Sequence, residues 1–277
     1  MEIQWALLIF TVFVSLAAGL FAALGVAAWY GKCAKLQMPG TIMAIAAFLV
    51  GGGVSALHLG HPERIFGGFS NLQSGVTREL IAFVIIGIIM VVYLVTLYRK
   101  VAISKALAAI AVLGSVGTVI VFADSYLMPA RPVWNTVLLP ATYLASAAVL
   151  GLFTLNILAA KQQEEVATLA LIRKATIVAL AVQSVVLLCY LGKIVIAPFP
   201  DPTRSLTRLL AGDLAIVFWV LVVLVGLVLP YRLLTGKAIH NSANIVRLTS
   251  TGLACAVIGG TAFRALLYVM GTTVFKF

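Results

Sequence analysis

The chain has 277 residues, of which 63% are hydrophobic and 10% are charged, and its formal net charge is +11. Soluble domains are about half apolar and about a quarter charged, so this composition excludes an ordinary soluble protein and indicates an integral membrane protein. In such a chain, positive charge is expected in the loops that fix topology. No basic stripe interleaved with aromatic residues indicates nucleic-acid binding.

Eight segments are apolar and, at about 20 residues, long enough to cross a bilayer as helices. We predict an all-α integral membrane protein, one eight-helix bundle over residues 1–277, with spans at residues 5–29, 39–58, 79–98, 104–127, 136–160, 168–192, 213–235 and 248–271. The N-terminus lacks a basic region and a cleavage site, so the first span is expected to be retained. Segment 193–212 contains APFPDPTR and, with its three prolines, is not expected to be a simple helix.

The loops predict the orientation of the bundle, since an even number of spans puts both termini on one side. The loops after the first, third, fifth and seventh spans carry 11 basic residues: Lys32, Lys35, Arg99, Lys100, Lys105, Lys161, Arg173, Lys174, Arg232, Lys237 and Arg247. The other loops and the tail carry 7: Arg64, Arg78, Arg131, Lys193, Arg204, Arg208 and Lys276. Because cytoplasmic loops hold the excess of Lys and Arg, both termini are predicted to be extracytoplasmic.

Polar residues gather at the predicted extracytoplasmic ends of the spans. His58 ends the second span, Glu79 begins the third, and Asp124 and Tyr126 end the fourth. Arg264 lies about two-thirds of the way across the last span. An ionisable residue inside the membrane is costly and usually pairs or lines a wet cavity, which favours a functional role for Arg264. Snorkelling of its side chain to the outer interface is the alternative.

His58 is the strongest candidate for chemistry. Glu79 is placed to hydrogen-bond its imidazole, and Arg64 lies in the connecting loop among apolar residues suited to a lipid-like ligand. A histidine that titrates near neutral pH can exchange a proton with a quinol hydroxyl, and a nearby carboxylate can relay that proton. Three further ionisable residues at this end are left without an assigned role: His61, Asp124 and Asp213.

Haem and iron–sulfur clusters are not expected in this chain. Bis-histidine haem needs two facing ligands, and the histidine outside the cluster, His240, falls in a loop on the opposite side. The three cysteines, Cys33, Cys189 and Cys255, are far apart and form no CxxC pair, so neither a cluster nor a structural zinc is expected.

Four stretches carry a resemblance to a known family: IQWALLIFTVF, LHLGHPERIFGGFSNLQSGVTRELIAF, SYLMPARPVWNTVLLP and FRALLY. The second resembles the family's histidine–Leu–Gly–x–Pro–x–Arg–x–Phe stretch, followed by an acidic residue that opens the third span. The others match a tyrosine, a Pro-x-Trp and a proline after the fourth span, and an arginine and tyrosine in the last span. The chain thus resembles the membrane anchor subunits of dimethyl sulfoxide reductases, the DmsC type, and more distantly the NrfD and polysulfide reductase anchors.

The resemblance implies a membrane anchor and quinol-oxidising subunit of a molybdenum oxidoreductase in a prokaryotic cytoplasmic membrane. Its implied partners are a four-cluster ferredoxin-like iron–sulfur subunit and a molybdenum catalytic subunit with a bis-pterin cofactor, docked on the extracytoplasmic face. His58 takes the position associated with menaquinol oxidation. The expected menaquinol site, with His58 and Glu79 as its catalytic pair, comprises His58, Arg64, Glu79, Arg264, Tyr126, Trp134 and Tyr268.

Two other functions stay open. A secondary transporter would use the charge cluster as a substrate site, although transporters commonly show symmetric broken helices near the midplane and this sequence has no such pair. A purely structural anchor would hold the partner subunits and bind no quinone.

Overall fold

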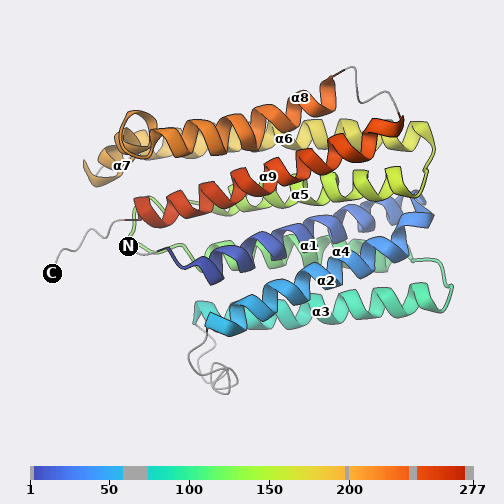
Figure 1. Cartoon of the computed structure of the whole chain (residues 1–277). Coiled ribbons are helices and arrows are strands. Elements are labelled where there is room, and N and C mark those ends of the chain that lie inside the picture. Colours follow the sequence, from blue (N-terminus) through green and yellow to red (C-terminus); the bar gives the residue numbers. More distant parts are fainter. Residues whose placement is uncertain (1–2, 59–73, 197–199, 237–241, 272–277) are drawn as a thin grey trace.

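The computed structural model describes residues 3–58, 74–196, 200–236 and 242–271. In this part of the chain every regular element is a helix (Figure 1), namely α1 (Trp5–Trp29), α2 (Ala34–His58), α3 (Gly75–Tyr98), α4 (Lys105–Asp124), α5 (Leu138–Lys161), α6 (Val166–Val195), α7 (Pro200–Ala211), the π-helix η2 (Val217–Val228), α8 (Leu229–Thr235) and α9 (Ser242–Met270). Among the described residues, eight helical segments are long and apolar enough to cross a membrane, with η2 and α8 together forming the seventh. The predicted eight-span, all-helical architecture is therefore confirmed.

The spans run antiparallel and fall into two halves. In Figure 1, α1 to α4 lie side by side in one half, and α5, α6, η2, α8 and α9 form the other. Helices α1 and α5 are the most buried spans and meet at the junction of the halves, whereas α3 and α6 are among the spans that face outward most. We call the end at which α1 begins and α9 ends the terminal end, and the opposite one the far end.

The junction between the halves depends on glycine. A side chain added at Gly19 of α1 would collide with the backbone of Ala147 in α5, and one added at Gly151 of α5 would collide with the backbone of Gly19. Because neither residue has a Cβ, the two helix backbones can touch, as small residues commonly allow in membrane bundles. This contact brings α5 close enough for α1 to reach the polar residues of the second half.

Segment 193–212 is not one simple helix, as expected, because α6 and a separate helix, α7, divide it; that α7 is itself helical was not predicted. Helix α6 continues to Val195, and α7 is a helix that begins at Pro200 and has Pro202 in its first turn. First-turn backbone N–H groups have no partner inside a helix, so proline is tolerated there. Helix α2 likewise begins at Ala34 rather than at residue 39, with Pro39 inside it.

Candidate functional site at the terminal end

The predicted site residues that the structure describes lie at the terminal end (Figure 1). His58 is the last residue of α2; its side chain lies outside the described residues, as do Arg64 and His61 entirely. Glu79 lies one turn inside α3, because that helix begins at Gly75. The other four follow α4 or belong to the last two turns of α9: Tyr126, Trp134, Arg264 and Tyr268.

The three aromatic residues among these, Tyr126, Trp134 and Tyr268, form a single cluster. The ring of Trp134 lies 5.7 Å from those of both Tyr126 and Tyr268, edge to face in each case. The hydroxyls of the two tyrosines are 3.2 Å apart, and Trp134 donates from Nε1 to the Leu267 carbonyl at 2.8 Å. Arg264 joins Tyr268 on one face of α9, since residues four apart in a helix are neighbours. The aromatic cluster therefore lies next to Arg264, on the side toward the terminal end.

The segment that carries Tyr126 and Trp134, residues 125–137, is irregular because its two prolines cannot continue α4. It is nevertheless fixed in place. Tyr190 of α6 is fully buried and donates from its hydroxyl to the Val133 carbonyl at 2.8 Å. The guanidinium of Arg131 lies 4.2 Å from the centre of the Trp134 ring, a cation–π contact. The aromatic cluster is thus positioned by α6 and α9 together.

Arg264 is 2% exposed, so the snorkelling alternative is wrong. It donates from Nη2 to the Ser15 hydroxyl of α1 at 2.9 Å, and from Nη1 to the Gly260 carbonyl at 3.2 Å and to the Ser146 hydroxyl of α5 at 3.5 Å. Its guanidinium also lies 4.6 Å from the centre of the Tyr143 ring. These contacts compensate for removing a charge from water and connect three helices at one side chain.

One part of the Arg264 guanidinium has no partner among the described residues. Its Nε and the Oε1 of Gln183 in α6 are both buried without a hydrogen bond there, and both residues line a cavity of about 20 Å³ between α5, α6, η2 and α9. A space of this size holds about one water molecule. The cavity is far too small for a quinol head group, so the Nε side of the Arg264 guanidinium does not bind a quinol.

The predicted carboxylates lie next to the aromatic cluster on the side of α3 and α4. The Glu79 side chain is half-buried and lies near the Ser125 hydroxyl, one residue before Tyr126. Asp124, to which the sequence assigned no role, forms a salt bridge of 2.8 Å with Arg78 that joins α4 to α3. Glu79 is therefore the carboxylate on these two helices that faces the aromatic cluster.

Asp213 has a local partner. It accepts two hydrogen bonds from Arg208 of α7, at 2.9 and 2.6 Å, across the turn that leads into η2. Both side chains are largely exposed. The pair closes the turn between α7 and the seventh span.

Sequence reasoning missed the residues around Arg264: Ser15, Tyr143 and Ser146, which contact its guanidinium, and Gln183, which lines the cavity beside it. Each is a polar residue inside an apolar span, and a buried arginine requires such acceptors. The spans contain many serines and threonines, however, and most of them bond to a carbonyl of their own helix, as Thr41, Thr154 and Thr176 do. Only the packing of α1, α5 and α9 shows which of them face Arg264.

Comparison with known proteins places the chain in a family. No curated protein sequence matches it. The family model described as polysulphide reductase, NrfD, matches residues 1–276, which is nearly the whole chain. The more distant part of the resemblance is thereby confirmed, and the DmsC type stays a prediction. The chain belongs to the NrfD polysulphide reductase family, whose members are membrane subunits of polysulphide reductase-like molybdoenzyme complexes.

Proposed function

We propose that this chain oxidises menaquinol at the terminal end and passes the electrons to an iron–sulfur subunit, as a membrane anchor of the DmsC type. The observation that carries the proposal is the convergence of Arg264, Tyr126, Trp134 and Tyr268. These residues come from two separate stretches of the sequence. The three aromatic rings contact one another, and Arg264 lies one helical turn from Tyr268, at the end of the bundle where α2 finishes with His58. Aromatic rings beside ionisable groups match a ligand with an apolar ring and polar hydroxyls.

The residues divide into those proposed to touch the quinol and those that position them. His58 and Glu79 act on the hydroxyl groups, and Tyr126 and Tyr268 flank the ring together with Trp134. Arg264 is engaged by Ser15, Ser146 and the Tyr143 ring. It is a positioning residue, which supplies a positive potential behind the tyrosines rather than a direct hydrogen bond.

Quinol oxidation releases electrons and protons together, and the protein residues handle the protons. Menaquinol gives up two protons with its two electrons. His58 accepts them from the quinol hydroxyls one after the other, and Glu79 orients the imidazole or receives each proton and returns it to the outer aqueous phase. The site lies at the membrane surface, so the electrons have a short path to a docked cluster. The proposed partners are the four-cluster ferredoxin-like subunit and the molybdenum bis-pterin subunit.

The proposed orientation places the terminal end outside the cytoplasm. Its support is the excess of Lys and Arg in the loops of the far end. A C-terminal alkaline phosphatase fusion is expected to be active, because that enzyme folds only outside the cytoplasm, and a fluorescent protein fusion is expected to be dark. The reverse pattern would place the proposed quinol site on the cytoplasmic face.

The central experiment replaces His58 with alanine in the assembled complex. Oxidation of a menaquinol analogue is expected to fall by more than tenfold, within the range that general acid–base groups contribute. Reduction of the terminal acceptor with an artificial dye is expected to stay unchanged, because the dye bypasses this subunit. His61→Ala, in the same stretch, is the matched control. Full quinol oxidation by the His58→Ala complex would remove His58 from the mechanism.

A second pair of variants tests the proton relay. Glu79→Gln is expected to slow quinol oxidation severalfold, whereas Asp124→Asn, which removes the neighbouring carboxylate paired with Arg78, is expected to leave the rate nearly unchanged. Equal effects of the two variants would assign the loss to surface charge. Extraction of the purified complex separates the rival functions, since a structural anchor or a transporter would carry no stoichiometric quinone.

A further inference from the structure

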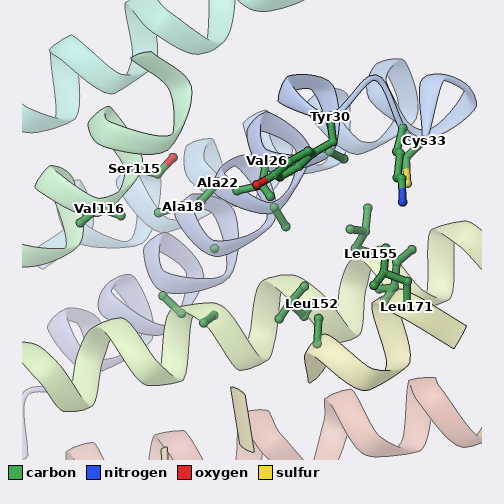
Figure 2. A pocket seen from close by; sticks show the side chains of 18 of the residues that line it. Ala18, Ala22, Val26, Tyr30, Cys33, Ser115, Val116, Leu152, Leu155 and Leu171 are labelled. Carbon is green, nitrogen blue, oxygen red and sulfur yellow. The ribbon is translucent and has the colours of Figure 1, made fainter. Parts of the chain in front are cut away.

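A second hollow lies toward the far end of the bundle, away from the proposed quinol site. It has a volume of about 500 Å³ and is bounded by α1, α4, α5 and α6 (Figure 2). We call it the far groove. This volume lies within the usual range for ligand pockets. Small side chains create the space, and Ala18, Ala22 and Ala148 are among those that line it.

The far groove opens sideways onto the region that lipid occupies. Val26 and Leu171 on its rim are 46% and 48% exposed, and Tyr30 at its end is 71% exposed. Its walls are almost entirely apolar, and the Ser115 hydroxyl donates to the Ala111 carbonyl of its own helix at 2.7 Å. Apolar walls of this kind offer water almost no hydrogen-bond partners, so they favour a hydrocarbon chain as the occupant.

The mouth of the far groove carries charge. Lys32 lines it and is exposed, and Lys35 follows in the first turn of α2. The Glu164 carboxylate also lies near: burial and then this charge raise the pKa of the Cys33 thiol at the mouth. Among the described residues that line the groove, Lys32 is the charged one, so the lining itself carries a positive charge at the mouth. Basic pockets between transmembrane helices on the cytoplasmic side favour anionic head groups.

We propose that the far groove binds an anionic phospholipid, with an acyl chain between α1, α4, α5 and α6 and its phosphate beside Lys32. A quinone tail is also apolar, but a quinone head group is neutral, so the charge of Lys32 would not favour its binding. The proposal is independent of quinol oxidation, because it concerns the opposite end of the bundle and different residues.

The test is native mass spectrometry of the full chain in its assembled complex, delipidated and then titrated with phosphatidylglycerol or with phosphatidylcholine of identical acyl chains. The wild-type complex is expected to bind one phosphatidylglycerol severalfold more tightly than one phosphatidylcholine. Equal affinity for the two lipids would overturn the proposal, because it would leave no role for the charge at the mouth.

Variants separate the acyl-chain contact from the phosphate contact. Ala22→Leu with Ala148→Leu fills the far groove and is expected to abolish binding of the one tight lipid, whereas Ala46→Leu on the exposed face of α2 is expected to leave it intact. Lys32→Glu is expected to remove the preference for phosphatidylglycerol while phosphatidylcholine still binds. Lys100→Glu, an exposed lysine at the same end that does not line the groove, is the charge control.

Two results would assign the far groove differently. Tight lipid binding that survives the filled groove would place the lipid elsewhere, and a quinone or a second copy of the chain found there would replace the phospholipid. Thermal unfolding and co-purification of the partner subunits check that each variant is assembled. Should the filled variant fail to assemble, the comparison of Lys32→Glu with Lys100→Glu still decides the proposal.

Discussion

The hydroxyl oxygens of Tyr126 and Tyr268 lie 3.2 Å apart, although 142 residues separate them in the chain. Tyr126 follows α4 in the first half of the bundle, and Tyr268 belongs to α9 in the second. The Trp134 ring contacts both. This contact therefore joins the two halves at the end of the bundle where the proposed quinol site lies.

Removing both hydroxyls of this pair is expected to cost less than the sum of the costs of removing each one alone. Tyr126→Phe or Tyr268→Phe alone leaves the other hydroxyl without this partner, at about 1 kcal/mol, while the ring packing is kept. The double variant is expected to be less destabilised than the sum of the two. Equilibrium unfolding in mixed micelles measures the coupling. Tyr98→Phe, 79% exposed at the far end, is the control, and strict additivity would show that the hydrogen bond does not form.

Arg264 is expected to be the most sensitive charged residue in the spans. Arg264→Lys keeps the charge but cannot reach Ser15 and Ser146 together, so a loss of about 2–3 kcal/mol is expected, as for hydrogen bonds to charged groups. Ser15→Ala removes one acceptor and is expected to cost about 1–3 kcal/mol.

The exposed Arg232 of α8 provides the matched control for Arg264. Arg232→Lys is expected to change the unfolding free energy by less than about 0.5 kcal/mol, as surface substitutions usually do. An Arg264→Lys variant as stable as Arg232→Lys would contradict the buried network.

The number and approximate positions of the spans could be predicted from the sequence, because apolar composition is a property of each segment alone. The sequence also singled out Arg264 as a candidate, because a charge inside an apolar run stands out without any knowledge of its neighbours, but only the structure shows that this side chain is buried. Ser15 and Tyr143 were not predictable, since their importance comes from facing Arg264 across helix contacts. Helix α7 was not predictable from its prolines alone, because proline breaks a helix interior but is tolerated in the first turn, where Pro200 and Pro202 lie.

The close contact between η2 and α9 predicts that a single added methyl group destabilises the protein. A Cβ at Gly226 would lie 2.7 Å from the Gly259 Cα, and a Cβ at Gly259 would collide with the backbone of Gly226. Gly259→Ala is therefore expected to destabilise the protein by about 1–3 kcal/mol, the usual cost of overpacking. It should also disturb Gln183, which lines the small cavity beside Arg264 with these glycines.

Gly117 of α4 is the control for this contact, because a Cβ there meets nothing within 4 Å. Gly117→Ala is expected to be neutral or to stabilise by up to about 1 kcal/mol through helix propensity. Equal destabilisation by the two variants in mixed-micelle unfolding would show that backbone conformation, rather than helix contact, determines the loss.

The Arg208–Asp213 ion pair is expected to stabilise α7 to an extent that depends on pH. Hydrogen bonds from Arg208 lower the pKa of the Asp213 carboxyl below its ordinary value. A carboxyl whose pKa is lower in the folded state stabilises that state above the unfolded pKa, which is about 4, and this contribution disappears as the pH falls through the folded pKa. Because both groups are exposed and screened by solvent, the effect is expected to be small and local.

Hydrogen exchange of the α7 amides measures this stabilisation. At pH 7, Asp213→Asn is expected to exchange faster in α7 than the wild type, since the ion pair that closes the turn is lost. Once the pH has fallen through the lowered pKa of the Asp213 carboxyl, the two proteins are expected to exchange alike, because the wild-type carboxyl is then protonated as well. Asp124→Asn, which breaks the Arg78 pair instead, is expected to leave α7 unchanged. A difference between wild type and Asp213→Asn that persists in acid would assign the effect to the side-chain amide and not to the charge.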